Sequence, residues 1–174
     1  IFKDPSKAVV IFSQFTSYLD VLEKVIKKVL IGVKVMKFTG SLSIEERNSV
    51  VKKFRRSTKP RVLLISLMAG GCGLTLLPCS TVFLSEPYYN PFVEKQAEER
   101  VHRIGQTSTV NIFRFNVKNS VETWINRMKQ KKICLASSLD LVTKNNKEVP
   151  TNFSFSDLSD LFQDFVGFTG NSSK

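Results

Sequence analysis

The chain has 174 residues, of which 42% are hydrophobic, and its formal net charge is +11. This length suits one domain and a tail, and the hydrophobic fraction is sufficient for a buried core. No apolar run reaches the roughly 20 residues that a membrane-spanning helix needs, so no membrane partner is expected. The three cysteines lack paired metal-ligand spacing, which favours a reduced intracellular protein with buried thiols.

The positive charge is unevenly distributed along the chain. Residues 141–174 carry three lysines and four carboxylates, a net charge of −1. Because the whole chain has a net charge of +11, residues 1–140 have a net charge of +12. A strongly basic body favours a polyanionic partner, and nucleic acid is favoured over membrane because no basic amphipathic helix stands out. An ordinary basic protein with a solvated surface is the alternative that charge alone leaves open.

The first elements alternate between strand and helix. Ala8–Phe12 is a β-branched, apolar run typical of a strand that is buried on both faces. Apolar residues at helical spacing then predict a helix over Ser17–Leu30. Val33–Phe38 alternates between apolar and polar residues, which predicts a strand nearer the edge of a sheet.

The same alternation continues through the middle of the chain. Ser43 with Glu46 three residues later predicts a capping box that opens a helix running to about Arg56. Val62–Ile65 and Thr81–Leu84 are short apolar runs that predict two further buried strands.

The last elements precede a change in composition. Pro91 suits the first turn of a helix, and Asn111–Val117 predicts a fifth strand. Asn119 with Glu122 is the expected cap of a helix over Val121–Cys134. Beyond it we expect a lobe ending at 137, a polar linker at 138–152, an acidic and aromatic docking helix at 153–168, and a disordered end at 169–174.

Five alternations of strand and helix predict an α/β domain with a mostly parallel sheet flanked by helices. In such sheets the chemistry lies in loops beyond the carboxyl ends of the strands. This rule selects four loops of the chain, which are Ser13–Thr16, Thr39–Ser43, Ser66–Leu74 and Ser85–Pro91.

A glycine cluster at residues 70–73 directly follows a predicted strand. Glycines let a backbone turn sharply and approach phosphate oxygens, although a tight turn without a ligand needs the same residues. The cluster is not a Walker A loop, because no Gly-Lys-Ser or Gly-Lys-Thr occurs in the chain. No Asp-Glu pair ends a strand either, so this chain is not expected to assemble a complete ATPase site by itself.

A second cluster, residues 96–106, combines glutamine with two arginines. On a helix, Gln96, Arg100 and Arg103 would share one face. Arginine stays charged and its planar fork matches phosphate oxygens, which suits an arginine finger at a transferring phosphate. A solvated helix face with an ion pair between Glu99 and Arg103 is the alternative.

Taken in order, these segments resemble the helicase motifs of one family. Residues 7–15 resemble motif IV, and residues 38–41 with Arg47 and Phe54 resemble the motif after it. Residues 66–76 resemble motif V, residues 86–91 resemble the Asp-x-x-Trp-Asn-Pro segment, and residues 96–106 resemble motif VI. Together, over about residues 7–135, they look like the C-terminal RecA-like lobe of SWI/SNF-type ATPases within helicase superfamily 2.

The resemblance implies the second motor lobe of an ATP-dependent translocase on double-stranded DNA, of the chromatin-remodelling or DNA-repair type and located in the nucleus. ATP and Mg²⁺ would be bound mainly by an N-terminal RecA-like lobe of the parent protein, and this chain alone would be inactive. Nucleosomes are a further implied partner. The implied catalytic residues are Arg100, Arg103 and Gln96, and Gly71 and Gly73 join the two arginines as nucleotide-site residues.

The implied DNA-backbone contacts lie in loops after the strands. They are Ser13, Gln14, Gly40, Ser41, Ser66, Met68, Ala69, Gly70 and Tyr89. Contacts to phosphate carry no base information, so tracking is expected to be independent of sequence.

The chain departs from the family pattern at a few of these motifs. Met68 replaces an arginine, Thr75 an asparagine, Glu86 an aspartate and Tyr89 a tryptophan, and Thr39 stands where an aspartate is common. These changes put the strength of DNA contact in doubt more than hydrolysis.

Three other functions are alternatives to the motor. The first is a degenerate lobe that binds DNA or protein without hydrolysis, against which Gln96, Arg100 and Arg103 speak. An RNA helicase of the same superfamily is disfavoured by Gln106, and a nucleotide-binding metabolic enzyme by the lack of a Gly-x-Gly-x-x-Gly loop.

Overall fold

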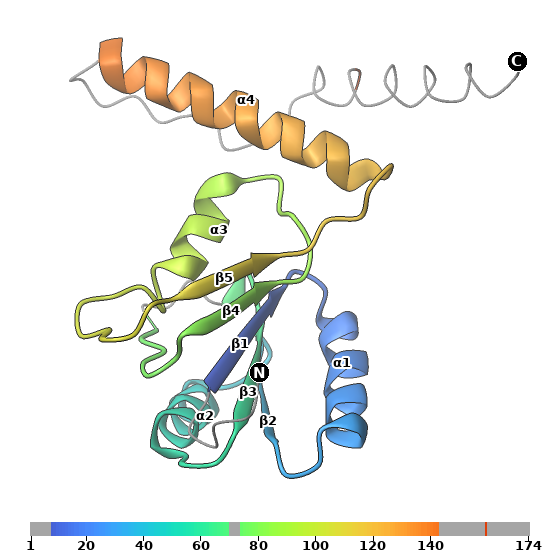
Figure 1. Cartoon of the computed structure of the whole chain (residues 1–174), viewed down its shortest axis with the longest axis vertical. Helices are drawn as coiled ribbons and strands as arrows, with labels where there is room; N and C mark the ends of the chain where they lie inside the picture. The colour runs from blue at the N-terminus through green and yellow to red at the C-terminus, as the bar shows by residue number, and fades with distance from the viewer. Residues whose placement is uncertain (1–7, 70–73, 143–158, 160–174) are drawn as a thin grey trace, which may run out of the picture. The chain divides into compact units, whose positions relative to one another are not determined.

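A computed structural model describes residues 8–69, 74–142 and 159 of the chain. Its strands form one parallel sheet in the order β2-β3-β1-β4-β5 (Figure 1). The strands are β1 (Ala8–Ser13), β2 (Lys34–Phe38), β3 (Arg61–Ser66), β4 (Thr81–Leu84) and β5 (Asn111–Arg114). The predicted α/β class with a parallel sheet is therefore confirmed.

The helices that precede residue 99 cover the sheet on both faces. The helices are α1 (Thr16–Val29), α2 (Ile44–Arg56), α3 (Pro91–Glu98) and α4 (Val121–Val142). Alternate residues of β1 serve two cores: Val9 packs with Leu19 and Ile26 of α1, whereas Val10 and Phe12 belong to the core that includes Phe54 of α2 and Ala97 of α3. The period of two along a strand produces this division, since successive side chains point to opposite faces.

The central strands are the most deeply buried. All six residues of β3 are buried, and β1 lies between β3 and β4. The strand predicted nearest an edge, β2, is an edge strand. At the other edge, β5 ends at Arg114, three residues before the predicted end of that strand.

The beginnings of two helices test the predicted caps. The capping box of α2 is confirmed, since the Glu46 N–H donates to Ser43 Oγ at 3.2 Å and the Ser43 N–H donates to Glu46 Oε2 at 2.8 Å. The cap predicted for α4 is wrong, because Asn119 has a φ of +55° and the Glu122 N–H donates to Ser120 Oγ.

Helix α4 extends past its predicted end at Cys134 to Val142. It therefore includes residues 138–142, the first part of the predicted linker. The remainder of that linker, the predicted docking helix at 153–168 and the end at 169–174 lie outside the described residues, Ser159 excepted. Among the described helices none combines the length and the apolar character needed to cross a membrane.

The chain divides into two compact units. The first comprises Ile1–Tyr88 and Phe92–Asn116 and contains the sheet, and the second comprises Tyr89–Pro91 and Val117–Lys174 and contains α4. The domain predicted at 1–137 thus spans the first unit and part of the second, and its boundary stays a prediction.

Candidate functional site

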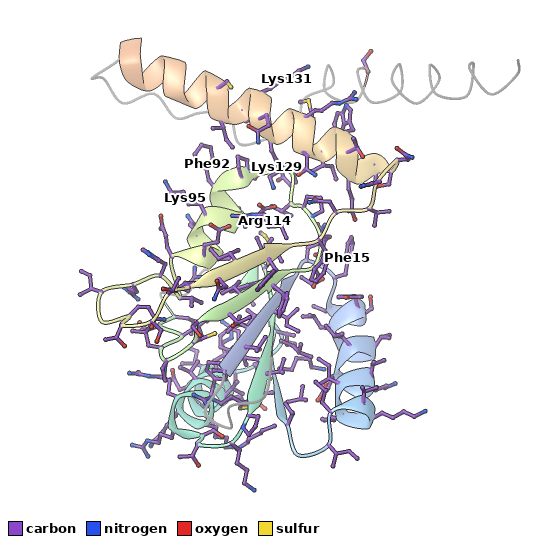
Figure 2. All side chains as sticks on the ribbon, viewed as in Figure 1. Phe15, Phe92, Lys95, Arg114, Lys129 and Lys131 are labelled. Carbon is purple, nitrogen blue, oxygen red and sulfur yellow. The ribbon has the colours of Figure 1, made fainter. Side chains whose placement is uncertain are left out.

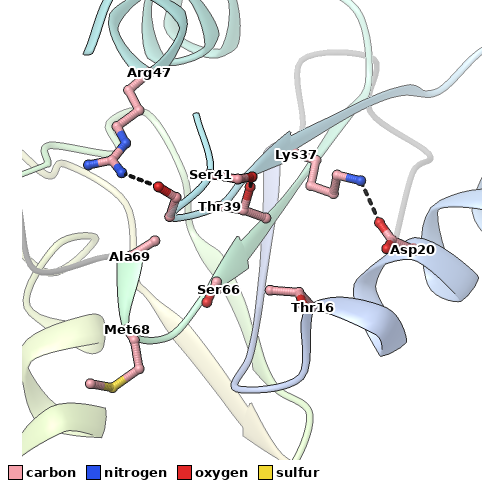
Figure 3. Close-up of a pocket in the computed structure, with 10 residues that line it drawn as sticks. Thr16, Asp20, Lys37, Thr39, Ser41, Arg47, Ser66, Met68 and Ala69 are labelled. Carbon is pink, nitrogen blue, oxygen red and sulfur yellow. Dashed lines mark hydrogen bonds and ion pairs between the residues drawn. The ribbon is translucent and has the colours of Figure 1, made fainter. Parts of the chain in front are cut away.

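A pocket of about 550 Å³ lies at the carboxyl ends of β2 and β3, and we call it the carboxyl-edge pocket (Figure 3). It is lined by Thr16, Asp20, Lys37, Thr39, Gly40, Ser41, Arg47, Ser66, Met68 and Ala69. Five of the predicted DNA contacts are among them, and they come from two loops separated by α2. The parallel sheet brings these loops together, because the carboxyl ends of its strands meet at one edge.

The loop after β2 is held by its own polar groups. Thr39 Oγ1 and Ser41 Oγ lie 2.8 Å apart, and Arg47 Nη2 donates to the Gly40 carbonyl at 2.7 Å. The Arg47 guanidinium also lies 5.9 Å from the centre of the Phe38 ring. A cation is thereby fixed beside the pocket, where it raises the local positive potential.

Gly40 leaves its side of the pocket open. A Cβ added to Gly40 would meet no heavy atom within 4 Å, and this residue has no left-handed φ. Folding therefore does not require glycine here, whereas a ligand that approaches the main chain closely does benefit from one.

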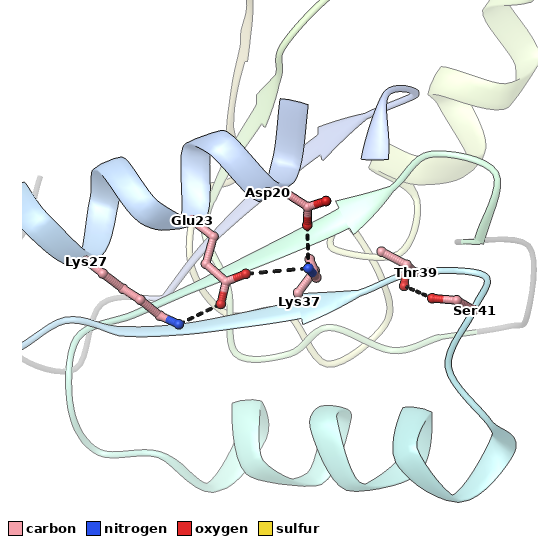
Figure 4. Close-up of polar contacts among 6 residues, drawn as sticks. All are labelled: Asp20, Glu23, Lys27, Lys37, Thr39 and Ser41. Atoms are coloured by element: carbon pink, nitrogen blue, oxygen red, sulfur yellow. Dashed lines mark hydrogen bonds and ion pairs between the residues drawn. The ribbon is translucent and has the colours of Figure 1, made fainter. Parts of the chain in front are cut away.

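A second cation of the pocket, Lys37, is engaged by two carboxylates of α1 (Figure 4). Lys37 Nζ lies 2.5 Å from Asp20 Oδ1 and 3.5 Å from Glu23 Oε2, and Glu23 also binds Lys27 at 2.7 Å. The hydrogen bond with Asp20 raises the pKa of Lys37. Sequence reasoning missed Asp20 and Lys37 as lining residues, because only the packing of α1 beside β2 brings them there, whereas Thr16 lies in a loop that it selected and Arg47 in a motif that it named.

Two predicted DNA contacts at the end of β1 have structural roles. Ser13 is 1% exposed, its Oγ accepts a hydrogen bond from the Phe15 N–H, and its carbonyl accepts one from Leu67. The Gln14 N–H donates to Glu86 Oε1 at 2.5 Å. Glu86 thereby joins the loop after β1 to the loop after β4. Phe15 lies exposed at the turn into α1 (Figure 2).

The tyrosine segment after β4 contacts the loop after β3. The Tyr88 hydroxyl lies 3.5 Å from Met68 Sδ, and the Tyr88 N–H donates to the buried Glu94 carboxylate at 2.6 Å. Tyr89, a predicted DNA contact, belongs to the second unit, where Lys132 Nζ lies 5.2 Å from the centre of its ring.

The helix predicted to carry Gln96, Arg100 and Arg103 on one face is wrong beyond α3, which ends at Glu98. The chain continues in turns, with the Val101 and His102 N–H groups both donating to the Glu98 carbonyl. These turns bury Val101 completely in the core. A continued helix would not require this burial. Gln96 lies exposed on α3 instead.

The turns bring both arginines to the segment that follows the glycine cluster. The Leu76 N–H donates to the Arg100 carbonyl at 3.1 Å, and Arg103 Nη1 donates to Thr75 Oγ1 at 2.8 Å. Arg103 is exposed and Arg100 half-buried. Gly70, Gly71 and Gly73 themselves lie outside the described residues.

Gln106, the last residue of the arginine segment (residues 96–106), has a structural role. Its Nε2 donates to the Cys79 carbonyl at 2.6 Å, and its Oε1 accepts from the Ser108 N–H at 3.2 Å. Both bonds fix the loops that enter β4 and β5. No sequence signal distinguishes this role from a ligand contact.

The donors at these sites suit phosphate rather than a metal ion. They are guanidinium groups, hydroxyls and a lysine, which donate to phosphate oxygens. Throughout the described ranges, no group of three or more His, Cys, Asp and Glu side chains could hold a metal ion. The residues present therefore do not fit a Mg²⁺ site.

Comparison with known proteins identifies the family. The model of the helicase conserved C-terminal domain matches residues 1–105. The chain belongs to the helicase C-terminal domain family. This membership, the relatives described next and the RecA-like fold confirm the resemblance to the C-terminal lobe of SWI/SNF-type ATPases that the sequence motifs indicate.

Relatives of this helicase C-terminal domain are large proteins. It is 43% identical over 139 residues to DNA repair protein RAD5 of Eremothecium gossypii, a match covering 78% of this chain and 13% of the relative. It is 38% identical over 136 residues to the ATP-dependent helicase ULS1 of Saccharomyces cerevisiae, covering 78% and 8%. The chain thus spans about an eighth or less of these relatives.

A solved structure has the same fold. The crystal structure of the C-terminal part of the Fun30 ATPase domain matches with a TM-score of 0.72 and 29% identity, covering 92% of this chain and 46% of that one. The helicase C-terminal domain described here is therefore RecA-like.

Proposed function

We propose that this helicase C-terminal domain is the second motor lobe of a nuclear, ATP-dependent translocase on double-stranded DNA that acts in DNA repair or chromatin remodelling. The observation that carries the proposal is the attachment of the arginine segment to the residues that follow the glycine cluster. Arg103 bonds Thr75, and the Arg100 carbonyl bonds Leu76. In this arrangement, movement of the phosphate-facing arginines is coupled to the loop that follows β3.

The arginines supply charge to the nucleotide site. A guanidinium stays protonated at any physiological pH and donates two parallel N–H bonds to phosphate oxygens. Arg103 is exposed and donates to Thr75 Oγ1. A bond from its guanidinium to a phosphate oxygen would be charge-assisted. ATP and Mg²⁺ are bound mainly by the N-terminal RecA-like lobe of the parent protein, with Gln96 and Arg100 completing the site from this side.

The carboxyl-edge pocket supplies the contacts to the DNA, which is the track of the motor. Thr39, Ser41 and Ser66 bring hydroxyl donors, Arg47 brings positive charge, and Gly40 leaves the main chain accessible. Such donors hold the phosphate backbone and read no bases, which suits a motor that moves along any sequence. The relatives, a DNA repair protein and an ATP-dependent helicase by name, support DNA as the track, and nucleosomes are a further candidate substrate.

The decisive experiment is steady-state ATP hydrolysis by the parent protein, with both lobes, in the presence and absence of duplex DNA. Arg103→Ala is expected to lower the DNA-stimulated rate about 10³-fold while ATP binding is largely kept, because an arginine finger acts on the transition state. Lys28→Ala, which removes an exposed cation of α1, is the matched control and is expected to hydrolyse ATP at the parent's rate.

Two outcomes would contradict the proposal. A parent protein without DNA-stimulated hydrolysis, or an Arg103→Ala variant as active as the parent, would favour a degenerate lobe that only binds DNA or protein. Stronger stimulation by duplex RNA than by duplex DNA would favour an RNA helicase.

A further inference from the structure

The two faces of the sheet differ in how far the helices cover them. Helices α2 and α3 pack on one face, and α1 packs on the other (Figure 1). On the face of α2 and α3, one row of paired residues crosses β3, β1, β4 and β5, and all its members are buried or half-buried: Leu63, Val10, Val82 and Ile112. That face is therefore covered from β3 to β5.

The face of α1 is covered on one side only. The neighbouring row of paired residues there consists of Leu64, Ile11, Phe83 and Phe113. Leu64 of β3 has no exposed area, Ile11 and Phe83 are half-buried, and Phe113 of β5 is 48% exposed. Parallel sheets carry helices on both faces. Within the part of the chain that the structure describes, the β4–β5 side of this face lacks such a cover.

An apolar groove lies where the cover by α1 ends, and we call it the α1–β4 groove. Its cavity has a volume of about 310 Å³, and Tyr18 and Leu22 of α1 face Phe83 and Phe115 across it. The Phe83 ring also stacks on the rings of Phe113 and Phe115. The described lining residues include no charged side chain. The groove therefore suits the apolar side chains of a partner.

Helix α1 supplies an apolar flank to this groove. Tyr18, Leu22, Val25 and Val29 follow one another at intervals of four, three and four residues, so they share one side of the helix. Leu22 is half-buried and the other three are exposed. Apolar residues at this spacing are the seam along which a second helix packs with its own apolar residues at i, i+3, i+4 and i+7.

The charges of α1 are divided between its two flanks. The carboxylates Asp20 and Glu23 lie on the flank toward β2, where both bind Lys37. Lys24 and Lys28 are exposed and form the row beside the apolar flank, and in the described ranges neither forms an ion pair. The margin of the groove on α1 is therefore basic, which favours an acidic partner.

We propose that the α1–β4 groove binds an amphipathic α-helix with an acidic polar face, supplied by another part of the parent protein. A helix is the element that covers a parallel sheet, and the flank of α1 has the spacing to receive one. This chain covers 13% of the RAD5 relative and 8% of the ULS1 relative, so a parent protein of that kind has much further sequence. A helix on the same polypeptide has a high effective concentration, which favours it over a separate protein or a second copy. The proposal rests on the proposed function only for the longer parent protein.

The test compares solvent access to the groove in the parent protein and in the 174-residue chain. Val25→Cys and Phe113→Cys place a thiol on each side of the groove, and mass spectrometry of peptides follows its reaction with N-ethylmaleimide. Both thiols are expected to react at least about tenfold more slowly in the parent protein, because the bound helix must open first. Lys53→Cys, an exposed site on α2, is the matched control and is expected to react equally in both. Thermal melting checks that each variant folds.

The charge of the partner is tested by reversing the basic margin. In the parent protein, Lys24→Glu with Lys28→Glu is expected to speed the labelling of Val25→Cys at least about twofold, because surface ion pairs with the acidic helix are lost. Lys52→Glu with Lys53→Glu makes the same change of net charge on α2 and is expected to leave the labelling rate unchanged. Equal effects of the two pairs would overturn the acidic assignment.

A cross-linker identifies the occupant. Val25→Cys carrying benzophenone-4-maleimide is expected to cross-link, within the parent protein, to one segment outside these 174 residues that has apolar residues at helical spacing and acidic residues between them. Cross-links to a segment without that spacing would overturn the helix.

Three labelling results would also refute the proposal. Equal rates in the parent protein and the chain would show that nothing covers the groove. Slow labelling of the chain at every concentration would assign the cover to its own residues, and slow labelling only at high concentration would assign it to a second copy. Arg103→Ala is expected to leave all these rates unchanged, so failure of the groove and failure of the ATPase proposal are separate results.

Discussion

At the scale of single residues, Gly32 and Gly40 differ in what they require. Gly32, after α1, has a φ of +85°, a conformation that side chains rarely adopt. Gly40 has neither a left-handed φ nor a neighbour within reach of an added Cβ. The first glycine therefore serves the fold, and the second leaves space in front of the main chain of the carboxyl-edge pocket.

Gly40→Ala is accordingly expected to change the free energy of unfolding by less than about 0.5 kcal/mol while it weakens duplex binding by the chain. Gly32→Ala is the opposite control: it is expected to cost about 1 kcal/mol through its left-handed φ and to leave duplex binding unchanged. Chemical denaturation and fluorescence anisotropy measure the two effects. Unchanged duplex affinity in Gly40→Ala would remove this glycine from the DNA contacts.

At the scale of secondary-structure elements, a polar network joins α1 to β2. Glu23 of α1 bonds Lys27 of the same helix and pairs with Lys37 of β2, and Lys37 also binds Asp20. The hydrogen bond from Lys27, followed by the charges of both lysines, lowers the pKa of Glu23 below its ordinary 4.5. A carboxylate with a lowered folded-state pKa stabilises the fold above that value and loses this contribution as the pH falls through it.

Glu23→Gln is therefore expected to cost roughly 0.3–1 kcal/mol at pH 7, the size of a partly exposed ion pair, and less at pH 3, where more of the Glu23 carboxylate is protonated. Denaturant unfolding at the two pH values measures the difference. Glu99→Gln, an exposed change outside the network, is expected to have no effect at either pH. An equal cost of Glu23→Gln at both pH values would assign its role to packing rather than charge.

Local sequence patterns predicted the presence of the strands and helices better than the residues at which they end. The β-branched runs and the Ser43–Glu46 capping box involve residues close in sequence, and both predictions are confirmed. The continued helix past Glu98 failed because burial of Val101 is a tertiary effect. Likewise, Lys37 and Asp20 are 17 residues apart, so no local spacing announces that they meet beside the carboxyl-edge pocket.

At the scale of the whole molecule, the proposed function assigns half of an ATPase site to this chain. It belongs to the helicase C-terminal domain family, yet it contains no Gly-Lys-Ser or Gly-Lys-Thr to hold the β- and γ-phosphates. Arg100 and Arg103 lie on turns after α3. Basic residues also line pockets at both ends of the strands. The chain thus has the fold of a RecA-like lobe, and in the proposed function it supplies the groups for only one side of the ATPase site.

The isolated chain is therefore expected to hydrolyse ATP at the background rate, with or without duplex DNA. Adding the N-terminal lobe of the parent protein in trans is expected to restore a DNA-stimulated rate that Arg103→Ala abolishes. A malachite green assay for released phosphate measures both. Hydrolysis by the isolated chain that survives purification to homogeneity would contradict the division of the site between two lobes.

Exposed apolar side chains near α1 also have a practical consequence. On the face that α1 covers, Phe83 stacks with Phe113 and Phe115 at ring-centroid distances of 5.1 and 5.7 Å, and the latter two rings are 48% and 56% exposed. Tyr18 and Val25 of α1 are exposed as well. Exposed hydrophobic side chains of this kind promote aggregation at high protein concentration. Mild detergent or arginine in the buffer should therefore extend the shelf life of the purified chain more than added salt does.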